Sequence, residues 1–411
     1  MCGCYDLLPT WVYALAEEVL EKSIQYPTVL GEAYRDIVEY YAEVLSNYGV
    51  HTMIHRVPDE YVWKHLGKSM NTDKPRYILL ARIGSGDKVL QYNGHYDVVA
   101  PGKGWTVTDP FTPKKIDGKL YGRGATDMKG GLAAFTAALA YLSSTKEPLD
   151  HIVEAAYVPD EEIGGLTGTG YLVRELGSRP DWVVIGEPSG LGTIWVGHKG
   201  LVWMEVIVKG RQTHASTPWL GDNAFEKMVC VARYLIERAK PSIESRVSRY
   251  EYDVEESRRP TMVMGGRLTA PGSVNIVPGE VSFSIDRRLI VEEKLEEAEE
   301  ELRRYVLEAA SNCGADVEIR VLSRLNPSFT DPDTDLVRTL SSIVEKVIGA
   351  SPRRVVCTGG LDLHYYTDAG VKAVAYGPGV FGVAHAANEY IVLDDLYRAV
   401  DVYVELGRRG F

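Results

Sequence analysis

The chain has 411 residues, of which 45% are hydrophobic and 25% are charged, so it can bury a large core and is too long for one ordinary domain. Its net charge of −12 argues against a general nucleic-acid partner, because binding to phosphate needs a basic surface. No apolar run approaches the roughly 18 residues of a membrane span, and the N-terminus lacks a signal-peptide pattern. We therefore expect a cytoplasmic protein of two domains that binds neither nucleic acid nor membrane.

Cysteine and amide usage add two expectations. The five cysteines are scattered and odd in number, which implies no disulfide framework. Cys2 and Cys4 lack a second cysteine pair, so we expect free thiols rather than a metal site. The chain contains three Gln and eight Asn beside many charged residues, and this depletion of heat-labile amides predicts a thermophilic source.

The first part of the chain predicts an α/β layer. Two strand-like runs, 76–83 and 88–99, flank the turn sequence GSGD, and we expect them to form a hairpin. Residues 130–144 predict an Ala- and Leu-rich helix that is apolar on most faces. The short Val- and Ile-rich runs 151–158 and 181–188 are typical of strands buried on both faces. Strands that alternate with helices indicate an α/β domain.

The pattern changes near residue 197. Six segments follow in the order strand, helix, strand, strand, helix, strand, which is the order of a ferredoxin-like split unit. They span residues 201–210, 223–240, 261–268, 281–290, 291–310 and 315–322. A helix at 333–349 and a strand at 372–378 then return to α/β character. We expect one domain made of residues 1–196 and 325–411, interrupted by an inserted domain of residues 197–324.

Charged and imidazole residues gather where the apolar runs of the α/β part end. They are His95, Asp97, Asp127, Asp160, Glu161, Glu162, Glu187 and His385. Each one alone has an ordinary explanation, such as a buried histidine, a helix cap or a turn residue. Together they would meet in the crevice beyond the strand ends, where open α/β sheets bind ligands. Carboxylates gathered there would repel one another unless a positive charge lay among them.

A divalent metal supplies that charge. Two histidines and three or more carboxylates, without paired cysteines, suit catalytic Zn²⁺, for which Co²⁺ or Mn²⁺ can substitute. Asp97 follows His95 by two residues in an extended segment. It therefore lies on the same side of the chain and can orient the imidazole.

Five segments resemble, in order, motifs of the M20 metallopeptidases and deacylases. This family includes acetylornithine deacetylase, succinyl-diaminopimelate desuccinylase, aminoacylase-1 and the glutamate carboxypeptidases. The segments are NGHYDVVA, GRGATDMKGG, DEEIGG, GEPS and HAANEY, and the first resembles G-H-x-D-V-V-P with Ala100 in place of the proline. The resemblance covers nearly the whole chain. It implies a zinc-peptidase-like α/β catalytic domain with an inserted ferredoxin-like α+β lid and dimerisation domain.

The resemblance also implies a role for each residue of the cluster. The ligands of two zinc ions would be His95 and Glu187 for one, Glu162 and His385 for the other, and Asp127 as the bridge. Asp97 would support His95, and Glu161 would be the general base. Asp160 would shape the turn. The peptide bond between Asp127 and Met128 would be cis.

The inserted domain would contribute further groups. GRQTHASTP resembles the lid motif of the family, which implies that His214 stabilises the oxyanion, in many members across a dimer interface. SVNIVPGEVSFSIDRRL resembles the segment that grips the substrate and implicates Asn275 and Arg288, since the planar fork of arginine can bind a carboxylate bidentately. Arg287 is an adjacent competitor, but strand alternation would point it the other way.

One segment departs from the family pattern. Where relatives often carry T-G-G-T-S-D-x-R, this chain has TGGLDLHYY, which is one residue shorter and places His364 at the arginine position. Thr358 and the backbone around Gly359 stay candidates for substrate contact. We infer no substrate specificity from this loop.

We expect a metal-dependent amide hydrolase that removes an acyl group from an N-acyl amino acid and forms a homodimer. A zinc carboxypeptidase or dipeptidase acting on short peptides is the alternative within the family. It differs in the side of the scissile amide that carries the recognised carboxylate. A remote alternative is a non-catalytic, metal-stabilised binding protein, whose mark would be the loss of Glu161 or of a metal ligand. This chain has lost none of them.

Overall fold

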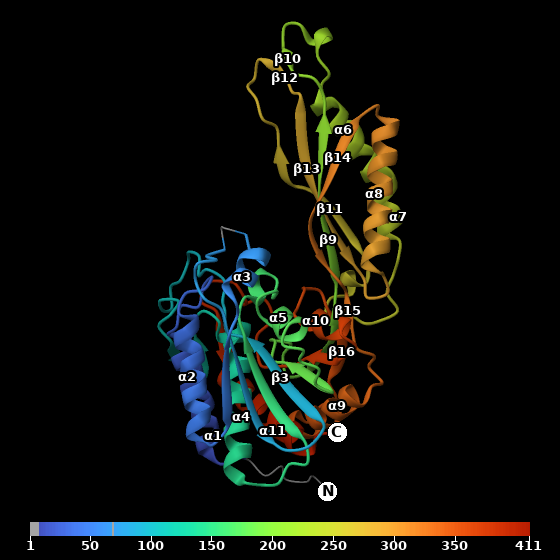
Figure 1. The fold of residues 1–411 in the computed structure, drawn as a ribbon. Helices are drawn as coiled ribbons and strands as arrows, with labels where there is room; N and C mark the ends of the chain where they lie inside the picture. Colours follow the sequence, from blue (N-terminus) through green and yellow to red (C-terminus); the bar gives the residue numbers. More distant parts are fainter. Residues whose placement is uncertain (1–7, 68–69) are drawn as a thin grey trace. The chain divides into compact units, whose positions relative to one another are not determined.

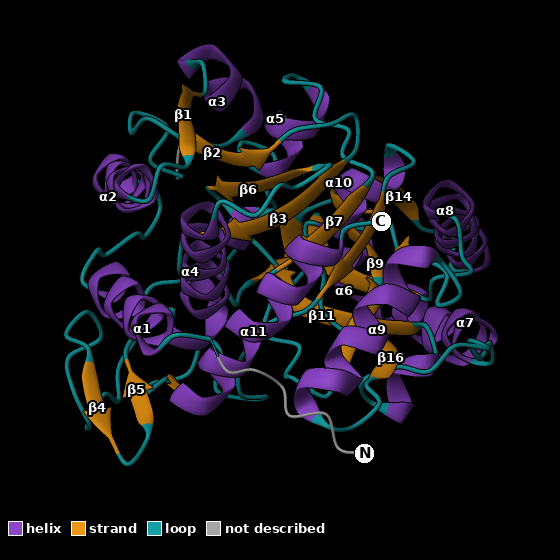
Figure 2. Cartoon of the chain, turned by 90° about the horizontal axis from the view of Figure 1, so that it is seen from below, coloured by secondary structure: helices purple, strands orange, loops and turns teal. Residues whose placement is uncertain are grey.

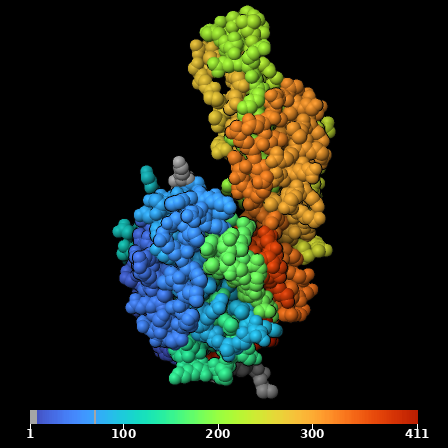
Figure 3. Space-filling model, in the orientation of Figure 1, coloured from blue at the N-terminus to red at the C-terminus, as the bar shows by residue number. Residues whose placement is uncertain are grey.

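The computed structural model describes residues 8–67 and 70–411, so Cys2 and Cys4 lie outside the described residues. The chain divides into two compact units. The first includes the chain up to Val196, Thr330–Arg354 and Leu361–Phe411, and the second comprises Gly197–Phe329 and Val355–Gly360. In the space-filling view, the first unit shows N-terminal segments in blue beside C-terminal segments in red (Figure 3). Segments from both ends of the chain therefore build one unit around an insertion.

A nine-stranded mixed sheet lies mostly in the first unit (Figure 1). From one edge to the other, its strands are β1 (His51–Arg56), β2 (Tyr77–Gly84), β6 (Ile152–Val158), β3 (Val89–His95), β7 (Trp182–Ile185), β17 (Lys372–Ala375), β8 (Thr193–His198) and β15 (Ser328–Phe329), with β16 (Arg353–Cys357) paired to β8. Strands β6, β3, β7 and β17 are parallel to one another. A smaller sheet consists of β18 (Tyr390–Val392), β5 (Lys119–Tyr121) and β4 (Lys114–Ile116).

Helices cover both faces of the large sheet. They are α1 (Thr10–Ile24), α2 (Tyr34–Asn47), α3 (Asp59–His65), α4 (Gly130–Thr145), α5 (Thr169–Arg174), α9 (Asp335–Ile348), α10 (Leu363–Asp368) and α11 (Leu393–Arg409). Figure 2 shows α4 and α11 on one face of the central strands and α5 and α10 on the other. The predicted helix is confirmed as α4, which is buried on most sides. A Cβ on Gly131 would lie 2.0 Å from the carbonyl oxygen of Gly186, so the glycine lets α4 pass close to the end of β7.

The predicted hairpin between residues 76–83 and 88–99 is wrong. Both strands form, as β2 and β3, but β6 lies between them. It pairs antiparallel with β2 and parallel with β3. The connecting turn packs on the chain that enters β6, since a Cβ on Gly84 would lie 2.2 Å from the carbonyl oxygen of His151. The turn residues were recognised correctly, but they carry no information about a partner strand far along the chain.

The second unit is an antiparallel sheet with helices on one face (Figure 1). In sheet order its strands are β11 (Thr261–Thr269), β13 (Glu280–Leu289), β9 (Gly200–Lys209) and β14 (Asp316–Leu325), and its helices are α6 (Ala224–Tyr234), α7 (Lys240–Glu244) and α8 (Leu295–Asn312). This arrangement agrees with the predicted ferredoxin-like order. Alternate residues of β9, from Val202 to Val208, pack in one core with residues of α6 and α8. A two-stranded ribbon of β10 (Thr213–His214) and β12 (Ile276–Val277) extends from this unit.

The expectation that the chain has no disulfide is wrong for the second unit. Cys230 in α6 and Cys313, directly after α8, form a disulfide across 83 residues of sequence. The two helices lie beside each other over the sheet, and this packing brings the thiols together. Cysteine spacing alone could not reveal the pairing. Among the described residues, no helix combines the length and the apolar character that crossing a membrane requires.

Removing the cross-link should destabilise the second unit. A closed loop of 83 residues corresponds to a loop-closure contribution of about 4–5 kcal/mol, and measured disulfides usually contribute about 2–4 kcal/mol. We expect the double variant Cys230→Ala/Cys313→Ala to lose about that much unfolding free energy in guanidinium titrations. Reductant should weaken the wild type similarly and leave the double variant unchanged. Equal stability of oxidised and reduced wild-type protein would contradict this prediction.

Candidate metal centre

The polar residues singled out in the sequence meet at the carboxyl edge of the parallel strands. β3 ends at His95, β6 ends at Val158 just before the acidic corner, and β7 ends two residues before Glu187. In register, His95 lies opposite Val158, and Asn93 lies opposite Ile185. Because these strands are parallel, the residues that follow them lie at one edge of the sheet.

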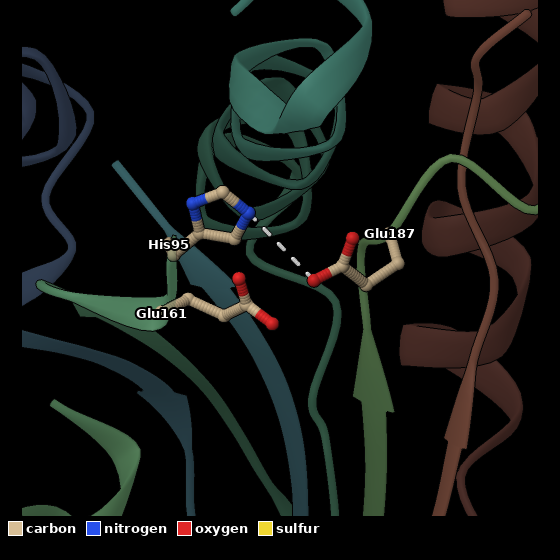
Figure 4. A group of neighbouring side chains, drawn as sticks. All are labelled: His95, Glu161 and Glu187. Carbon is tan, nitrogen blue, oxygen red and sulfur yellow. Dashed lines mark ion pairs between the residues drawn. The ribbon is translucent and has the colours of Figure 1, made fainter. Parts of the chain in front are cut away.

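Two groups of potential metal ligands lie side by side at this edge. In each group, one donor atom of every member lies within 4.8 Å of the others. The groups are His95, Glu161 and Glu187, drawn in Figure 4, and Asp127, Glu162 and His385. Asp127 lies between them, since its Oδ1 is 3.1 Å from Nε2 of His95 and its Oδ2 is 3.3 Å from Nε2 of His385. The bond from Asp127 to Met128 is cis, as the family resemblance implied.

The electrostatics of the cluster favour a bound cation. Burial raises the pKa of Glu161 well above its ordinary range, raises that of Glu187 to about 8, and also raises that of Glu162. Hydrogen bonds to Asp127, and then to Glu162, raise the pKa of His385 to about 10. Oε1 of Glu187 is buried and accepts no hydrogen bond from the described residues. A cation among these groups would favour ionised carboxylates and neutral imidazoles.

The donor set fits two divalent metal ions. Imidazole nitrogen and carboxylate oxygen are ligands that Zn²⁺, Co²⁺ and Mn²⁺ share. Asp127 directs one oxygen toward each histidine, so its carboxylate can serve both metal positions. The buried oxygen of Glu187 without a hydrogen bond is free to be a ligand.

Asp97 holds the acidic corner as well as the imidazole. Its two carboxylate oxygens accept the backbone N–H groups of Glu161 and Glu162, each at 3.2 Å. Nδ1 of His95 lies 3.0 Å from the backbone oxygen of Asp97 and 3.5 Å from its carboxylate. One side chain therefore positions both the ring and the two glutamates. The sequence predicted only the contact with the ring.

Asp160, the first acid of the corner, points away from the cluster into a buried ion pair. Its carboxylate accepts hydrogen bonds from Nε of Arg76 at 2.7 Å and from the hydroxyl of Tyr34 at 2.8 Å. The backbone at Asp160 has a φ of 64°, in the left-handed region, which breaks the alternation of the strand. Both following glutamates can then face the cluster. Asp160 thus anchors the turn.

Sequence reasoning missed several residues around the centre. Arg76 lies 84 residues before Asp160, and no pattern links the two. Asp362 lies in the loop that departs from the family, and burial raises its pKa to about 7. A Cβ on Gly165 would lie 2.0 Å from Oδ1 of Asp362, so this close approach needs a glycine. Glu389 could have been found, because it lies within the HAANEY motif.

The residues predicted in the inserted domain occupy two places in the second unit. His214 and Asn275 lie together on the ribbon, where His214 pairs with Ile276 and the carbonyl oxygen of Asn275 accepts the N–H of Ala215 at 2.9 Å. The hydroxyl of Ser273 donates to the side-chain oxygen of Asn275 at 2.5 Å. The ribbon therefore presents the histidine and the amide side by side.

Arg288 lies near the C-terminal end of β13, whereas the ribbon strand β12 precedes the opposite end of β13. Its guanidinium pairs with Asp286 at 2.9 Å and lies over the ring of Trp203, 5.9 Å from the centroid. Arg287 points to the opposite face, as strand alternation predicted, and is buried against Glu293 at 2.7 Å. Arg288 is therefore the partly accessible cation of the two.

The departing loop offers no extra positive charge. In the second unit, the N–H and the hydroxyl of Thr358 both donate to Asp253. In the first unit, burial lowers the pKa of His364 to about 4, and its ring lies against that of Tyr365. His364 is therefore neutral near pH 7 and cannot act as a cation in place of arginine.

Comparisons with known proteins identify the family. The family model described as "Peptidase family M20/M25/M40" matches residues 92–409. Succinyl-diaminopimelate desuccinylase of Xanthomonas campestris pv. campestris (strain 8004) is 30% identical over 345 residues, which cover 80% of this chain and 86% of the relative. The desuccinylase of Nautilia profundicola is 28% identical over 337 residues with the same coverage.

Solved structures show the same fold. The M20 family metallo-carboxypeptidase Sso-CP2 from Sulfolobus solfataricus has a TM-score of 0.75 at 21% identity, covering 96% of this chain and 98% of its own. A dinuclear metal-binding M20 peptidase from Bacillus subtilis has a TM-score of 0.70 at 15% identity, covering 98% of this chain and 99% of its own. The family match spans most of the chain, including the ligand cluster. The chain belongs to the peptidase family M20/M25/M40 and is a metal-dependent amide hydrolase.

Proposed function

We propose that the protein is a dinuclear zinc hydrolase that removes the acyl group from an N-acyl amino acid. The observation that carries the proposal is the position of Asp127 between two ligand groups, with Glu161 beside them. Similarity to desuccinylases, whose name denotes removal of an acyl group from an amino acid, supports the substrate class.

The chemistry divides between the metal ions and the side chains. Two divalent ions at this centre would polarise the amide carbonyl and lower the pKa of the attacking water. Glu161 lies beside His95 and Glu187, and the proposal assigns it the role of base rather than ligand, so that its carboxylate takes a proton from that water. It then passes the proton to the departing amine. The C–N bond breaks, the water oxygen stays on the acyl carbon, and Glu161 is restored.

His214 is suited to stabilise the negative oxygen that develops on the carbonyl. The N–H of Ser216 donates to its Nδ1 at 3.1 Å, and the hydroxyl of Ser216 lies 2.7 Å from the same atom. Since Nδ1 accepts a hydrogen bond, the proton of the neutral ring lies on Nε2, which can donate. The ring is exposed, so this donor is available to a substrate.

Substrate recognition would fall to Asn275 and Arg288. Nε and Nη2 of Arg288 donate to Asp286 and the guanidinium lies over Trp203, so Nη1 is the donor that would reach a substrate carboxylate. The neutral His364 supplies no second cation. A zinc carboxypeptidase or dipeptidase of the same family stays the second candidate. The non-catalytic alternative finds no support, because Glu161 and all five predicted ligands are present.

The proposal includes a homodimer formed through the second unit. Phe225, Val229 and Ile236 lie along α6 and its continuation at nearly helical spacing, and each side chain is half-exposed. An exposed apolar stripe of this kind is typical of an interaction surface.

The Cys230–Cys313 disulfide and the depletion of amides support a thermophilic source, since cytoplasmic disulfides are common among hyperthermophiles.

A hydrolysis screen tests the proposed activity. The zinc-loaded enzyme should release amino acid from acetyl-ornithine, acetyl-lysine or succinyl-diaminopimelate with a higher kcat/KM than it shows for dipeptides. Preference for dipeptides would favour the second candidate. No hydrolysis of any substrate by metal-loaded protein would contradict the proposal.

Loss of the general base should separate metal binding from turnover. Glu161→Gln keeps the size of the side chain but cannot take a proton. We expect metal content near that of the wild type and a kcat lower by about 10²–10⁴-fold, which is typical of general-base loss. Metal content by elemental analysis and kcat on the best substrate check this. Near-normal turnover with full metal would exclude Glu161 as the base.

Mixed dimers test whether His214 acts across subunits. Inactive Glu161→Gln protein mixed with inactive His214→Ala protein should regain activity after subunit exchange, because some hybrid sites receive both intact residues. The matched control mixes two differently tagged Glu161→Gln proteins, which should stay inactive. Absence of recovery despite proven exchange would place His214 in the same subunit as its site or outside the mechanism.

A further inference from the structure

We propose that Arg123 and Glu389 form a buried clamp that positions Asp127 and His385, and that the clamp thereby controls metal affinity without contacting metal. Neither residue has a role in the activity argued above. The inference rests on the proposed metal centre and deepens it. Arg123 precedes Asp127 by four residues, and Glu389 follows His385 by four, so each ligand shares a short segment with one clamp residue.

Glu389 shapes the segment that leads to Asp127. Its Oε1 accepts the backbone N–H groups of Thr126 at 2.9 Å and Asp127 at 3.0 Å, and its Oε2 accepts that of Gly124 at 3.1 Å. The side chain is fully buried. One carboxylate thus binds three N–H groups within four residues, including that of the ligand itself. Hydrogen bonds to a buried charged group are the stronger kind, so this contact defines the loop.

Arg123 connects that carboxylate to the segment of His385. Its Nη1 donates to Oε2 of Glu389 at 2.5 Å, and its Nη2 donates to the carbonyl oxygens of His385 at 3.1 Å and Pro101 at 3.3 Å. The guanidinium is buried and lies over the ring of Trp105. The backbone of His385 has a φ of 63°, a region that residues other than glycine seldom adopt. The bond from Arg123 to its carbonyl stabilises that conformation.

The main chain strengthens the same connection. The N–H of Gly122 donates to the carbonyl oxygen of Glu389 at 2.9 Å, and the hydroxyl of Thr126 donates to that of Tyr390 at 2.6 Å. Strands β5 and β18 pair directly beside these contacts. Two segments more than 250 residues apart are therefore held together at the positions that carry two of the predicted ligands.

The clamp acts through position rather than through charge. Arg123 and Glu389 neutralise each other in a buried site, so together they add no net charge to the metal cluster. Asp127 faces both ligand groups, whereas His385 belongs to one of them. Loosening the clamp should therefore weaken most the metal position that contains His385. Partners that orient metal ligands typically contribute about 10- to 100-fold to metal affinity.

The substitution Glu389→Gln breaks the clamp with a minimal change of shape. An amide places an NH₂ group where one carboxylate oxygen accepted bonds, so donors then face donors. The matched control is Glu154→Gln in the same unit. Glu154 is also buried and paired with an arginine, Arg82, but it hydrogen-bonds within the sheet rather than to a ligand segment. Both variants should lose thermal stability, because each replaces a buried carboxylate that is paired with an arginine.

The experiment titrates metal-free protein with Co²⁺ and follows binding by absorption and calorimetry. Glu389→Gln should raise the Kd of at least one of the two Co²⁺ positions by about 10- to 100-fold. Glu154→Gln should leave both Kd values unchanged. If Glu389→Gln lowers the melting temperature but leaves both Kd values at the wild-type level, the pair is merely structural and the proposal is overturned.

A second variant keeps the test decisive if Glu389→Gln fails to fold. Arg123→Lys retains the charge beside Glu389 but loses the fork that also reaches His385. It should weaken Co²⁺ binding at one position while melting closer to the wild type than Glu389→Gln does. Unchanged Kd values in this variant would also overturn the clamp. Failure of the wild-type protein itself to bind two Co²⁺ ions would instead contradict the proposed function, so the two failures are distinguishable.

Discussion

Buried negative charge is the constraint around which the first unit is organised. Carboxylates at the end of the parallel strands must each find a positive partner or stay protonated. Asp160 has Arg76, and Glu389 has Arg123. Asp97 binds backbone N–H groups, and Asp362, with a pKa raised to about 7, is partly protonated near neutrality.

The acids that have no arginine or lysine partner are the candidate metal ligands. Glu162 and Glu187 have no arginine or lysine partner among the described residues, and burial raises the pKa of both. The carboxylate of Asp127 pairs with the two histidines of the cluster. Charge pairing therefore separates Asp160 and Glu389, which pair with arginines, from Glu162 and Glu187. The same criterion leaves Glu161, which the proposed mechanism uses as a base, without a cation of its own.

Local sequence patterns predicted the polar residues at the strand ends better than they predicted the order of the strands. His95 and Glu187 follow apolar runs directly, so strand ends and ligand types could be predicted from local pattern. The insertion of β6 between β2 and β3 could not, because a turn sequence does not specify a partner strand. The Cys230–Cys313 disulfide could not be predicted for the same reason, since it depends on how α6 and α8 pack. Information that lies in contacts between distant segments is absent from local patterns.

Contacts between distant segments also decide how the centre relates to folding. Asp97 and Asp160 fix the backbone of the acidic corner, and Glu389 fixes that of Asp127. A structural zinc site, by contrast, is often ordered by the metal itself, so that folding and metal binding are one event. Here protein groups supply the hydrogen bonds that define the acidic corner and the Asp127 segment. The chain's own hydrogen bonds therefore orient these candidate ligands, while the repulsion among their buried carboxylates is what a bound cation would offset.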